Sequence, residues 1–277
     1  MTARPRAEEP LSLREVLARA GRAAERFGSE LQGIVAREQY LQTIRPWTGR
    51  LPEPAAAGPI LESRRLVGSL LLVHDPATPW QLHRDVLTVD GQPVGDRDAR
   101  LAELFADPAV DARDRLRRIT EDSARHNLGH VTRTINVPTF PLILVHPSHA
   151  DRFRASDRGQ LHEDGARVRL VRLRERGRPR LIRGDRMRDV ALEALLAIDE
   201  ETGEIVRAVL TPQGGDLKAH LEVTFGRIDA LPVRVPVRMW EWYWVHDVPE
   251  RDRYVEGEAT YDDFRRYTTD VHAPVVR

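Results

Sequence analysis

The segment IDEETGEIVRAVL, residues 198–210, has the pattern of a β-hairpin. Apolar residues lie on both sides of Glu201, Thr202 and Gly203, and glycine is favoured where a turn needs a positive φ. Short turns separate this hairpin from other segments with strand-like patterns, which predicts an antiparallel meander. The predicted strands cover residues 151–156, 166–174, 190–199, 204–211, 217–226, 234–246 and 254–268.

The first half of the chain predicts a long helix followed by three strands. Ser12 and Glu15 form a capping box, and apolar residues then recur at helical spacing, which predicts a helix over about 12–31. This apolar face has to pack against another element. Strands are predicted at 34–45, 62–75 and 80–94, with a tight turn at Asp90 and Gly91.

The middle of the chain has helical periodicity. Residues 96–108 and 111–128 have the pattern of helices, with Gly129 as the stop of the second one. PTFPLILVH, residues 138–146, is apolar on every side and predicts a short buried helix.

These elements predict an α+β fold, because a large antiparallel sheet curls and its concave face must be filled. We expect an open half-barrel, with the N-terminal helix and the central helices packed on the concave face. Residues 1–10 are predicted to be a disordered lead. Residues 11–272 are predicted to form a single domain, with a helical insertion at about 96–147.

Composition excludes several classes of protein. The 277 residues carry 43 basic and 43 acidic side chains, whereas a nucleic-acid binder is expected to be basic. No stretch approaches the ~20 apolar residues of a membrane span. The absence of cysteine excludes disulfides and thiolate chemistry. The first residues contain no apolar signal region, so we expect a cytosolic protein if the chain is full length. A periplasmic or secreted protein is expected if a signal peptide has been removed.

The segment VRMWEWYWVHD, residues 237–247, is unusually rich in aromatic side chains. On a strand, the tryptophans share one face, whereas Met239 and Tyr243 share the other, so both faces are apolar. Such residues could be ordinary core, a docking surface for a protein partner, or the wall of a ligand cavity. The cavity hypothesis names as its candidate wall Trp240, Trp242, Trp244, Tyr243, Met239, Leu142 and Leu144.

Catalytic and metal motifs are weak. Asp122, His126 and His130 are spaced four residues apart and could share one helix face as zinc ligands, although Gly129 is expected to end the helix before His130. The sequence has no HExxH, GxSxG, P-loop or GxGxxG motif. We therefore predict no catalytic residue and no cofactor, and a metal-dependent hydrolase is the weaker alternative.

Three segments together resemble the C-terminal half of the LolA-like family. They are LLAIDEETGEIVRAVLTP, HLEVTFGRIDALPVRVPVRMWEWY and GEATYDDFRRYTT, at residues 195–212, 220–243 and 257–269. That family comprises bacterial outer-membrane lipoprotein carriers and mycobacterial lipid-transport relatives. The segment RTINVPTFPLILVHPSHADRFR, residues 133–154, is similar to a further group of bacterial proteins with the features of secretion.

The LolA resemblance implies an unclosed barrel whose apolar cavity lies under helices. It also implies an envelope protein that binds or carries an acyl chain, lipid or lipoprotein without covalent chemistry. An envelope protein is a possible second partner, docked through the tryptophan-rich strand. Neither nucleic acid nor a membrane-spanning segment is expected.

Overall fold

The computed structural model describes residues 11–31, 34–54, 58–75, 78–95, 118–119, 121–129, 136–163, 165–183, 189–214, 218–245 and 252–266. The predicted disordered lead at 1–10 and the predicted helix at 96–108 lie outside these residues. Of the predicted helix at 111–128, residues 118–119 and 121–128 are described: 118–119 and 121–124 are helical, whereas 125–128 form a turn and a bend.

Antiparallel strands form one large sheet. Within the described part of the chain, neighbouring strands follow the order β4-β3-β2-β1-β12-β11-β10-β9-β8-β6-β5, and β7 pairs with β8. The strands are β1 (Ile34–Pro46), β2 (Glu62–Asp75), β3 (Thr78–Val89), β4 (Gln92–Pro93), β5 (Phe153–Glu163), β6 (Ala166–Glu175), β7 (Ile182–Arg183), β8 (Asp189–Asp199), β9 (Ile205–Gln213), β10 (Ala219–Gly226), β11 (Val235–Val245) and β12 (Arg253–Arg266).

The order of the strands contains the predicted meander and one long-range pairing. From β5 to β12, consecutive strands of the sheet are neighbours, apart from the short β7. The last strand, β12, then pairs antiparallel with β1, so the N-terminal strands extend the sheet from the C-terminal one. Strands β4 and β5 lie at the two ends of the path, and the sheet is not closed.

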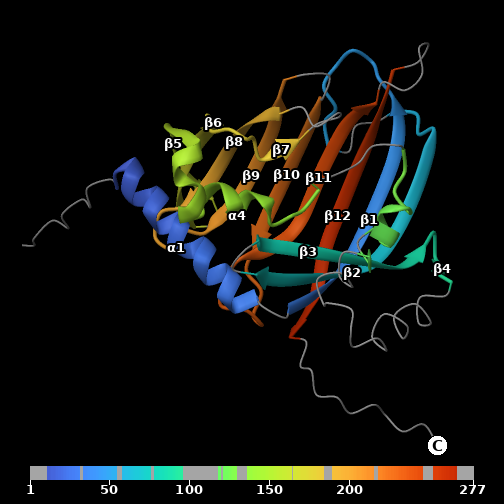
Figure 1. Ribbon diagram of the computed structural model, residues 1–277, viewed down its shortest axis with the longest axis horizontal. Helices are drawn as coiled ribbons and strands as arrows, with labels where there is room; N and C mark the ends of the chain where they lie inside the picture. The colour runs from blue at the N-terminus through green and yellow to red at the C-terminus, as the bar shows by residue number, and fades with distance from the viewer. Residues whose placement is uncertain are drawn as a thin grey trace, which may run out of the picture.

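Helices cover the concave face of this sheet. Helix α1 (Leu13–Leu31), helix α4 (Phe140–Val145) and the 3-10 helix η1 (Pro147–Arg152) lie on the same side of the strands (Figure 1). Residues 121–129 approach the same face at its far end. There, the backbone N–H of Leu128 donates to Gln42 on β1 at 2.7 Å. The α+β fold with an open, helix-covered sheet is therefore confirmed.

The main core lies between the helices and the concave face. One cluster joins the inner face of α1 to α4 and to strands from both ends of the sheet. It includes Val16, Ala20, Ala24, Phe27, Leu66, Leu70, Leu142, Leu144, Leu196, Leu210, Val223, Met239 and Tyr243. Side chains of this size interdigitate at the density of an organic crystal, so the concave face is filled rather than hollow.

One strand boundary differs clearly from its prediction. The predicted strand at 151–156 begins at Phe153 and continues to Glu163. Pro147 starts the 3-10 helix before it, and the ring of His146 accepts a hydrogen bond from the Ser148 N–H at 3.3 Å. The register of β5 shifts between Asp157 and Gln160, and Gly159 there has a φ of 100°. This irregularity breaks the alternation on which a sequence-based strand prediction depends.

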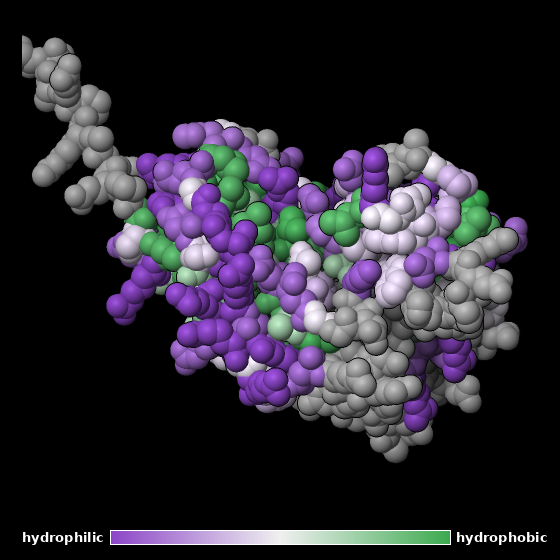
Figure 2. Space-filling model, turned by 90° about the horizontal axis from the view of Figure 1, so that it is seen from above, coloured by the Kyte–Doolittle hydropathy of each residue, from purple (hydrophilic) through white to green (hydrophobic). Residues whose placement is uncertain are grey.

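Figure 2 shows hydrophilic residues predominating on one face, with small patches of hydrophobic residues between them. Among the described helices, none has the length and apolar composition required to span a membrane.

Candidate ligand-binding interior

Helix α1 is the main cover of the concave face. Its capping box forms as predicted, since the Ser12 N–H donates to Glu15 at 2.9 Å and the Glu15 N–H donates to Ser12 Oγ at 3.3 Å. The buried face of the helix contains several small residues, Ala20, Gly21, Ala23, Ala24 and Gly28. A Cβ added at Gly21 would lie 3.2 Å from the carbonyl oxygen of Val145, so α4 packs directly on α1 at this point.

An apolar cavity lies at the C-terminal end of α1. Its volume is about 40 Å³, and the strands that line it are β3, β2, β1, β12 and β11, which are consecutive in the sheet. The lining residues are Phe27, Leu31, Ile34, Ala36, Leu70, Leu82, Pro138, Thr139, Val235, Pro236, Tyr261 and Phe264. Sites for small molecules usually have volumes of roughly 300–1,000 Å³, so the interior is closed in this structure.

The structure divides the seven predicted wall residues between two faces of the sheet. Met239 and Tyr243 on β11 belong to the main core, together with Leu142 and Leu144 of α4. Trp240, Trp242 and Trp244 lie on the opposite, outer face of β11. The alternation of the strand places them there, as the sequence predicted, but the helices that the structure describes cover only the inner set.

The outer tryptophans form an aromatic cluster of their own. Trp240 and Trp242 are each only 5% exposed, and Tyr254, Trp244 and Trp47 complete the cluster. The rings of Trp47 and Trp242 are 6.0 Å apart, and Trp240 Nε1 donates to Glu256 at 2.9 Å. Sequence analysis missed Trp47, because it follows β1 and reaches the cluster only through the pairing of β1 with β12.

A histidine and the only lysine of the chain border the aromatic cluster. His220 stacks on Trp242 with 6.3 Å between the ring centroids, and burial lowers its pKa although Glu222 acts in the opposite direction. The imidazole is therefore neutral at neutral pH. The Lys218 ammonium lies 4.4 Å from the centroid of the Trp244 ring, within the range of a cation–π contact.

Polar side chains are buried in the main core beside the predicted wall. The hydroxyl groups of Tyr40 and Tyr243 both donate to the Glu241 carboxylate, the latter at 2.7 Å. Arg84 forms a two-point ion pair with Glu38, with one contact at 2.8 Å. Burial and the nearby Glu38 carboxylate raise the pKa of Tyr261 well above its ordinary value. These groups are satisfied within the protein, as buried polar atoms generally must be.

Gly257 provides the space for this polar group. A Cβ at this position would lie 2.7 Å from the Tyr40 ring and 2.9 Å from Glu241 Oε1. Sequence analysis assigned no role to Glu241. Its tyrosine partners come from β1 and from β11 itself, and the β1 partner could not be found without the strand order.

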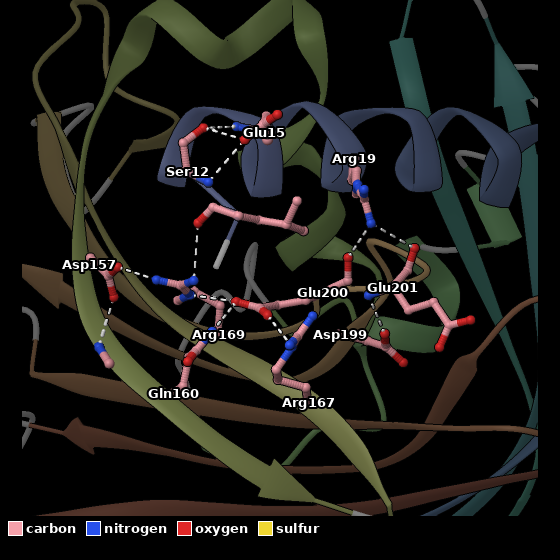
Figure 3. A network of polar contacts seen from close by, with 12 residues as sticks. Ser12, Glu15, Arg19, Asp157, Gln160, Arg167, Arg169, Asp199, Glu200 and Glu201 are labelled. Atoms are coloured by element: carbon pink, nitrogen blue, oxygen red, sulfur yellow. Dashed lines mark hydrogen bonds and ion pairs between the residues drawn. The ribbon is translucent and has the colours of Figure 1, made fainter. Parts of the chain in front are cut away.

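A network of ion pairs holds the N-terminal end of α1 on the sheet; we call Asp157, Arg169 and Glu200 the anchor network. Arg169 Nε contacts Glu200 at 2.7 Å, and Arg169 Nη1 contacts Asp157 at 2.6 Å. A third N–H of Arg169 donates to the carbonyl oxygen of Leu11 at 3.1 Å. Figure 3 shows this network beneath the start of α1. The apolar cover is thus attached through polar contacts at its edge.

The two carboxyl groups of the anchor network have lowered pKa values. For Glu200, burial opposes the shift, but hydrogen bonds from Gln160 and Arg169 outweigh it. For Asp157, the main cause of the lowered pKa is a hydrogen bond from the Gly159 N–H. Burial opposes this shift, and Arg169 adds to it. Both groups are therefore ionised at neutral pH.

The structure describes only two of the three predicted metal ligands, Asp122 and His126. Asp122 pairs with Arg125 at 3.1 Å, and the backbone carbonyl of His126 accepts a hydrogen bond from Arg64 at 3.0 Å. The helix ends at Ala124, four residues before its predicted end, and Gly129, with a φ of 74°, lies beyond it in a bend. His130 lies outside the described residues. Within the described ranges, no group of three metal-ligating side chains converges.

The arrangement is an apolar interior covered by helices α1 and α4. Comparison of the sequence with protein-family models gave no match, and comparison with curated proteins gave none at a significant level. Comparison with solved structures did give matches. The structural neighbours are DUF1329 family, lipoprotein-sorting and LolA superfamily proteins.

Three neighbours cover nearly the whole chain at low identity. A DUF1329 family protein from Desulfovibrio piger is 10% identical, covers 94% of each chain and has a TM-score of 0.42. An outer membrane lipoprotein-sorting protein domain from Vibrio parahaemolyticus is 10% identical, with 92% and 93% coverage and a TM-score of 0.45. A LolA superfamily protein from Nitrosomonas europaea is 10% identical, with 94% and 95% coverage and a TM-score of 0.32. Since these TM-scores are below 0.5, the likeness says nothing of a ligand.

Proposed function

We propose that this protein binds or carries an apolar or amphipathic ligand, such as an acyl chain, a lipid or a lipoprotein, and catalyses no reaction on it. The supporting observation is the apolar concave face, covered by a helix whose attachment at the edge is polar. The bacterial cell envelope is the proposed location, in keeping with the resemblance of residues 195–269 to the LolA-like family.

Helix α1 is suited to be displaced as a unit. The small residues of its buried face bring little apolar area to the sheet, so separating them costs less than separating leucines or phenylalanines. Phe27 and Leu31 are the larger contacts, and both line the apolar cavity at the C-terminal end of the helix. A ligand that enters there replaces the contacts that these two residues lose.

Burial of an acyl chain supplies free energy that offsets the cost of opening the interior. A cavity of about 40 Å³ cannot hold an acyl chain, so α1 must move before a chain is bound. Burial of about ten methylene groups yields ~8 kcal/mol, at ~0.8 kcal/mol for each group. The measured affinity is this gain less the cost of opening, as expected when a ligand selects a minor state.

Filling the cavity tests the proposal. The variant Ala36→Leu places a larger side chain among the lining residues, whereas Ala18→Leu makes the same change on the exposed side of α1. We expect the wild type to take up a fluorescent fatty acid, Ala36→Leu to bind it about tenfold more weakly, and Ala18→Leu to bind as the wild type does. Absence of uptake by the wild type, or equal affinity in all three proteins, would contradict the proposal.

The movement of α1 can be measured directly, because the chain has no cysteine of its own. Spin labels at Glu25→Cys on α1 and Thr260→Cys on β12 occupy exposed positions on the helix and the sheet. We expect the distance between the labels to lengthen when the fatty acid is added. An unchanged distance at saturation would show that the ligand binds elsewhere.

A protein partner at the tryptophan-rich strand remains a prediction. Trp240 and Trp242 are almost completely buried, so such a partner would contact Trp47 and Trp244 at the edge of the aromatic cluster. The metal-dependent hydrolase also remains a prediction, since His130 is not described.

A further inference from the structure

A charged groove lies on the outer side of α1, opposite the apolar interior. It has a volume of about 380 Å³ and lies between α1, the turn after β8 and the residues that follow β10. Four arginines and two glutamates line it: Arg19, Arg22, Arg26, Arg227, Glu201 and Glu204. Its volume lies within the usual range of small-molecule sites, roughly 300–1,000 Å³.

The groove has an excess of positive charge. Arg19 donates to the backbone carbonyl of Glu200 at 2.7 Å, and Arg26 donates to that of Thr202 at 3.0 Å. These contacts orient the two guanidinium groups but do not neutralise them, because a carbonyl has no net charge. Arg227 is paired with Glu204 at 2.8 Å. Exposed Arg22 makes no polar contact with any described residue, so its N–H groups are available.

The fold imposes this crowding of like charges. Arg19, Arg22 and Arg26 are spaced three and four residues apart, so they share one face of α1 and repel one another. The turn lies close against this part of α1, since a Cβ at Gly203 would lie only 2.5 Å from the backbone of Arg19, and Gly203 has a φ of 76°. Figure 3 shows Arg19 reaching from α1 to the turn that contains Glu200 and Glu201. A bound anion would relieve the repulsion.

The groove and the apolar interior meet at one residue. Glu204 lines the groove and also a small apolar gap beneath α1, which Ala20, Ala24 and Phe27 border from the helix. This gap measures only about 10 Å³, so a single amphipathic molecule places its charged group outside α1 and its apolar chain beneath the helix only after α1 moves as proposed above.

We propose that this groove binds a phosphate group, and that this phosphate is part of the headgroup of the ligand whose chain enters the interior. The guanidinium group suits phosphate because its planar set of N–H donors matches two phosphate oxygens. The assignment of phosphate to a lipid rests on the function proposed above. A soluble phosphate ester presents the same chemistry, so the test must separate the two sources.

Titration with inorganic phosphate tests the groove itself. The variant Arg22→Gln removes the arginine without a described partner, and Arg14→Gln makes the same change on α1, at an exposed position outside the groove. By calorimetry at low ionic strength, we expect Arg22→Gln to weaken phosphate binding about tenfold and Arg14→Gln to change it less than about twofold. No saturable binding by the wild type, or equal weakening in both variants, would overturn the proposal.

Titration with a short-chain phosphatidic acid and with the matching neutral diacylglycerol distinguishes the sources. A lipid headgroup predicts that the phosphatidic acid binds more tightly than inorganic phosphate and that Arg22→Gln weakens only the charged lipid. Equal affinity for phosphatidic acid and inorganic phosphate would refute the lipid source. If phosphate binds in the groove but the fluorescent fatty acid is never taken up, the carrier function fails while the phosphate site stands.

Discussion

Both faces of strand β11 carry buried side chains, but the two faces are closed in different ways. On the inner face, Met239 and Tyr243 belong to the core beneath α1 and α4, elements more than ninety positions away in the sequence. On the outer face, Trp240 and Trp242 are covered by aromatic side chains beside neighbouring strands, chiefly Trp47 and Tyr254. Burial alone therefore does not identify a ligand site. What distinguishes the inner face is that helices cover it, and the proposed function requires one of them, α1, to move.

The largest expected effect is a loss of stability, without a loss of ligand binding, from a substitution on the outer face. Trp242→Ala removes the central ring of the aromatic cluster, which should lower the free energy of unfolding by about 3–5 kcal/mol. Uptake of the fluorescent fatty acid by the folded protein should not change, because Trp242 faces away from the cavity. Urea unfolding and fatty-acid titration measure the two quantities.

Leu144→Ala is the matched change on the inner side. It should lower the free energy of unfolding by a similar amount, about 2–5 kcal/mol, and should also alter fatty-acid affinity. Loss of uptake in Trp242→Ala alone would reverse the comparison and place the ligand on the outer face.

The next effect concerns the polar group inside the core. Gly257→Ala forces a methyl group against Tyr40 and Glu241. We expect a loss of about 2–3 kcal/mol in the free energy of unfolding, from overpacking and a disturbed hydrogen bond. Gly95→Ala is the control, since a Cβ there meets nothing within 4 Å. A Gly257→Ala protein as stable as the control would show that the core around Glu241 is loosely packed.

A smaller effect is expected at the anchor network. Arg169→Met removes the ion pairs with Asp157 and Glu200 and the contact with Leu11, but Glu200 keeps Arg167 and Gln160 as partners. The free energy of unfolding at neutral pH should fall by about 2 kcal/mol. Fatty-acid uptake should become faster because α1 is held less firmly. Slower uptake would contradict the role of α1 as the cover.

The pH dependence of stability tests the same network. The pKa values of Asp157 and Glu200 are lowered in the folded protein, so unfolded chains bind more protons as pH falls. The stabilisation from these groups is present above the unfolded pKa values of about 4, and it is lost as pH falls through the lower folded values. Thermal unfolding between about pH 5 and pH 2 should show this loss in the wild type and a flatter slope in Arg169→Met.

Most of the elements could be predicted from the sequence because their patterns are local. The capping box of Ser12 and Glu15, the Asp90–Gly91 turn and the hairpin around Gly203 depend on residues a few positions apart. The 3-10 helix at Pro147 and the irregular stretch near Gly159 were missed, because each interrupts a periodic pattern. The pairing of β1 with β12 joins the two ends of the chain, and no local pattern encodes it.

The candidate site was less predictable for the same reason. Alternation along β11 correctly separated Met239 and Tyr243 from the tryptophans, but it could not say which face the helices cover. Trp47, Tyr40 and Arg169 acquire their roles only when strands distant in sequence become neighbours. The arginines of α1 have an ordinary pattern for an exposed helix face, and only the close approach of Gly203 shows that they enclose a groove.

The smallest expected effect lies at the first turn of α1. Ser12→Ala removes the hydroxyl that accepts from the Glu15 N–H, and the loss of an N-cap costs about 1 kcal/mol in the free energy of unfolding. Ser29→Ala is the control on the same helix, because its hydroxyl donates only to the Arg26 carbonyl at 2.9 Å. Urea unfolding should separate the two variants. If Ser12→Ala lowered the free energy of unfolding more than Arg169→Met does, the helix cap rather than the anchor network would be the main attachment of α1. Opening would then begin with fraying of the helix at Ser12.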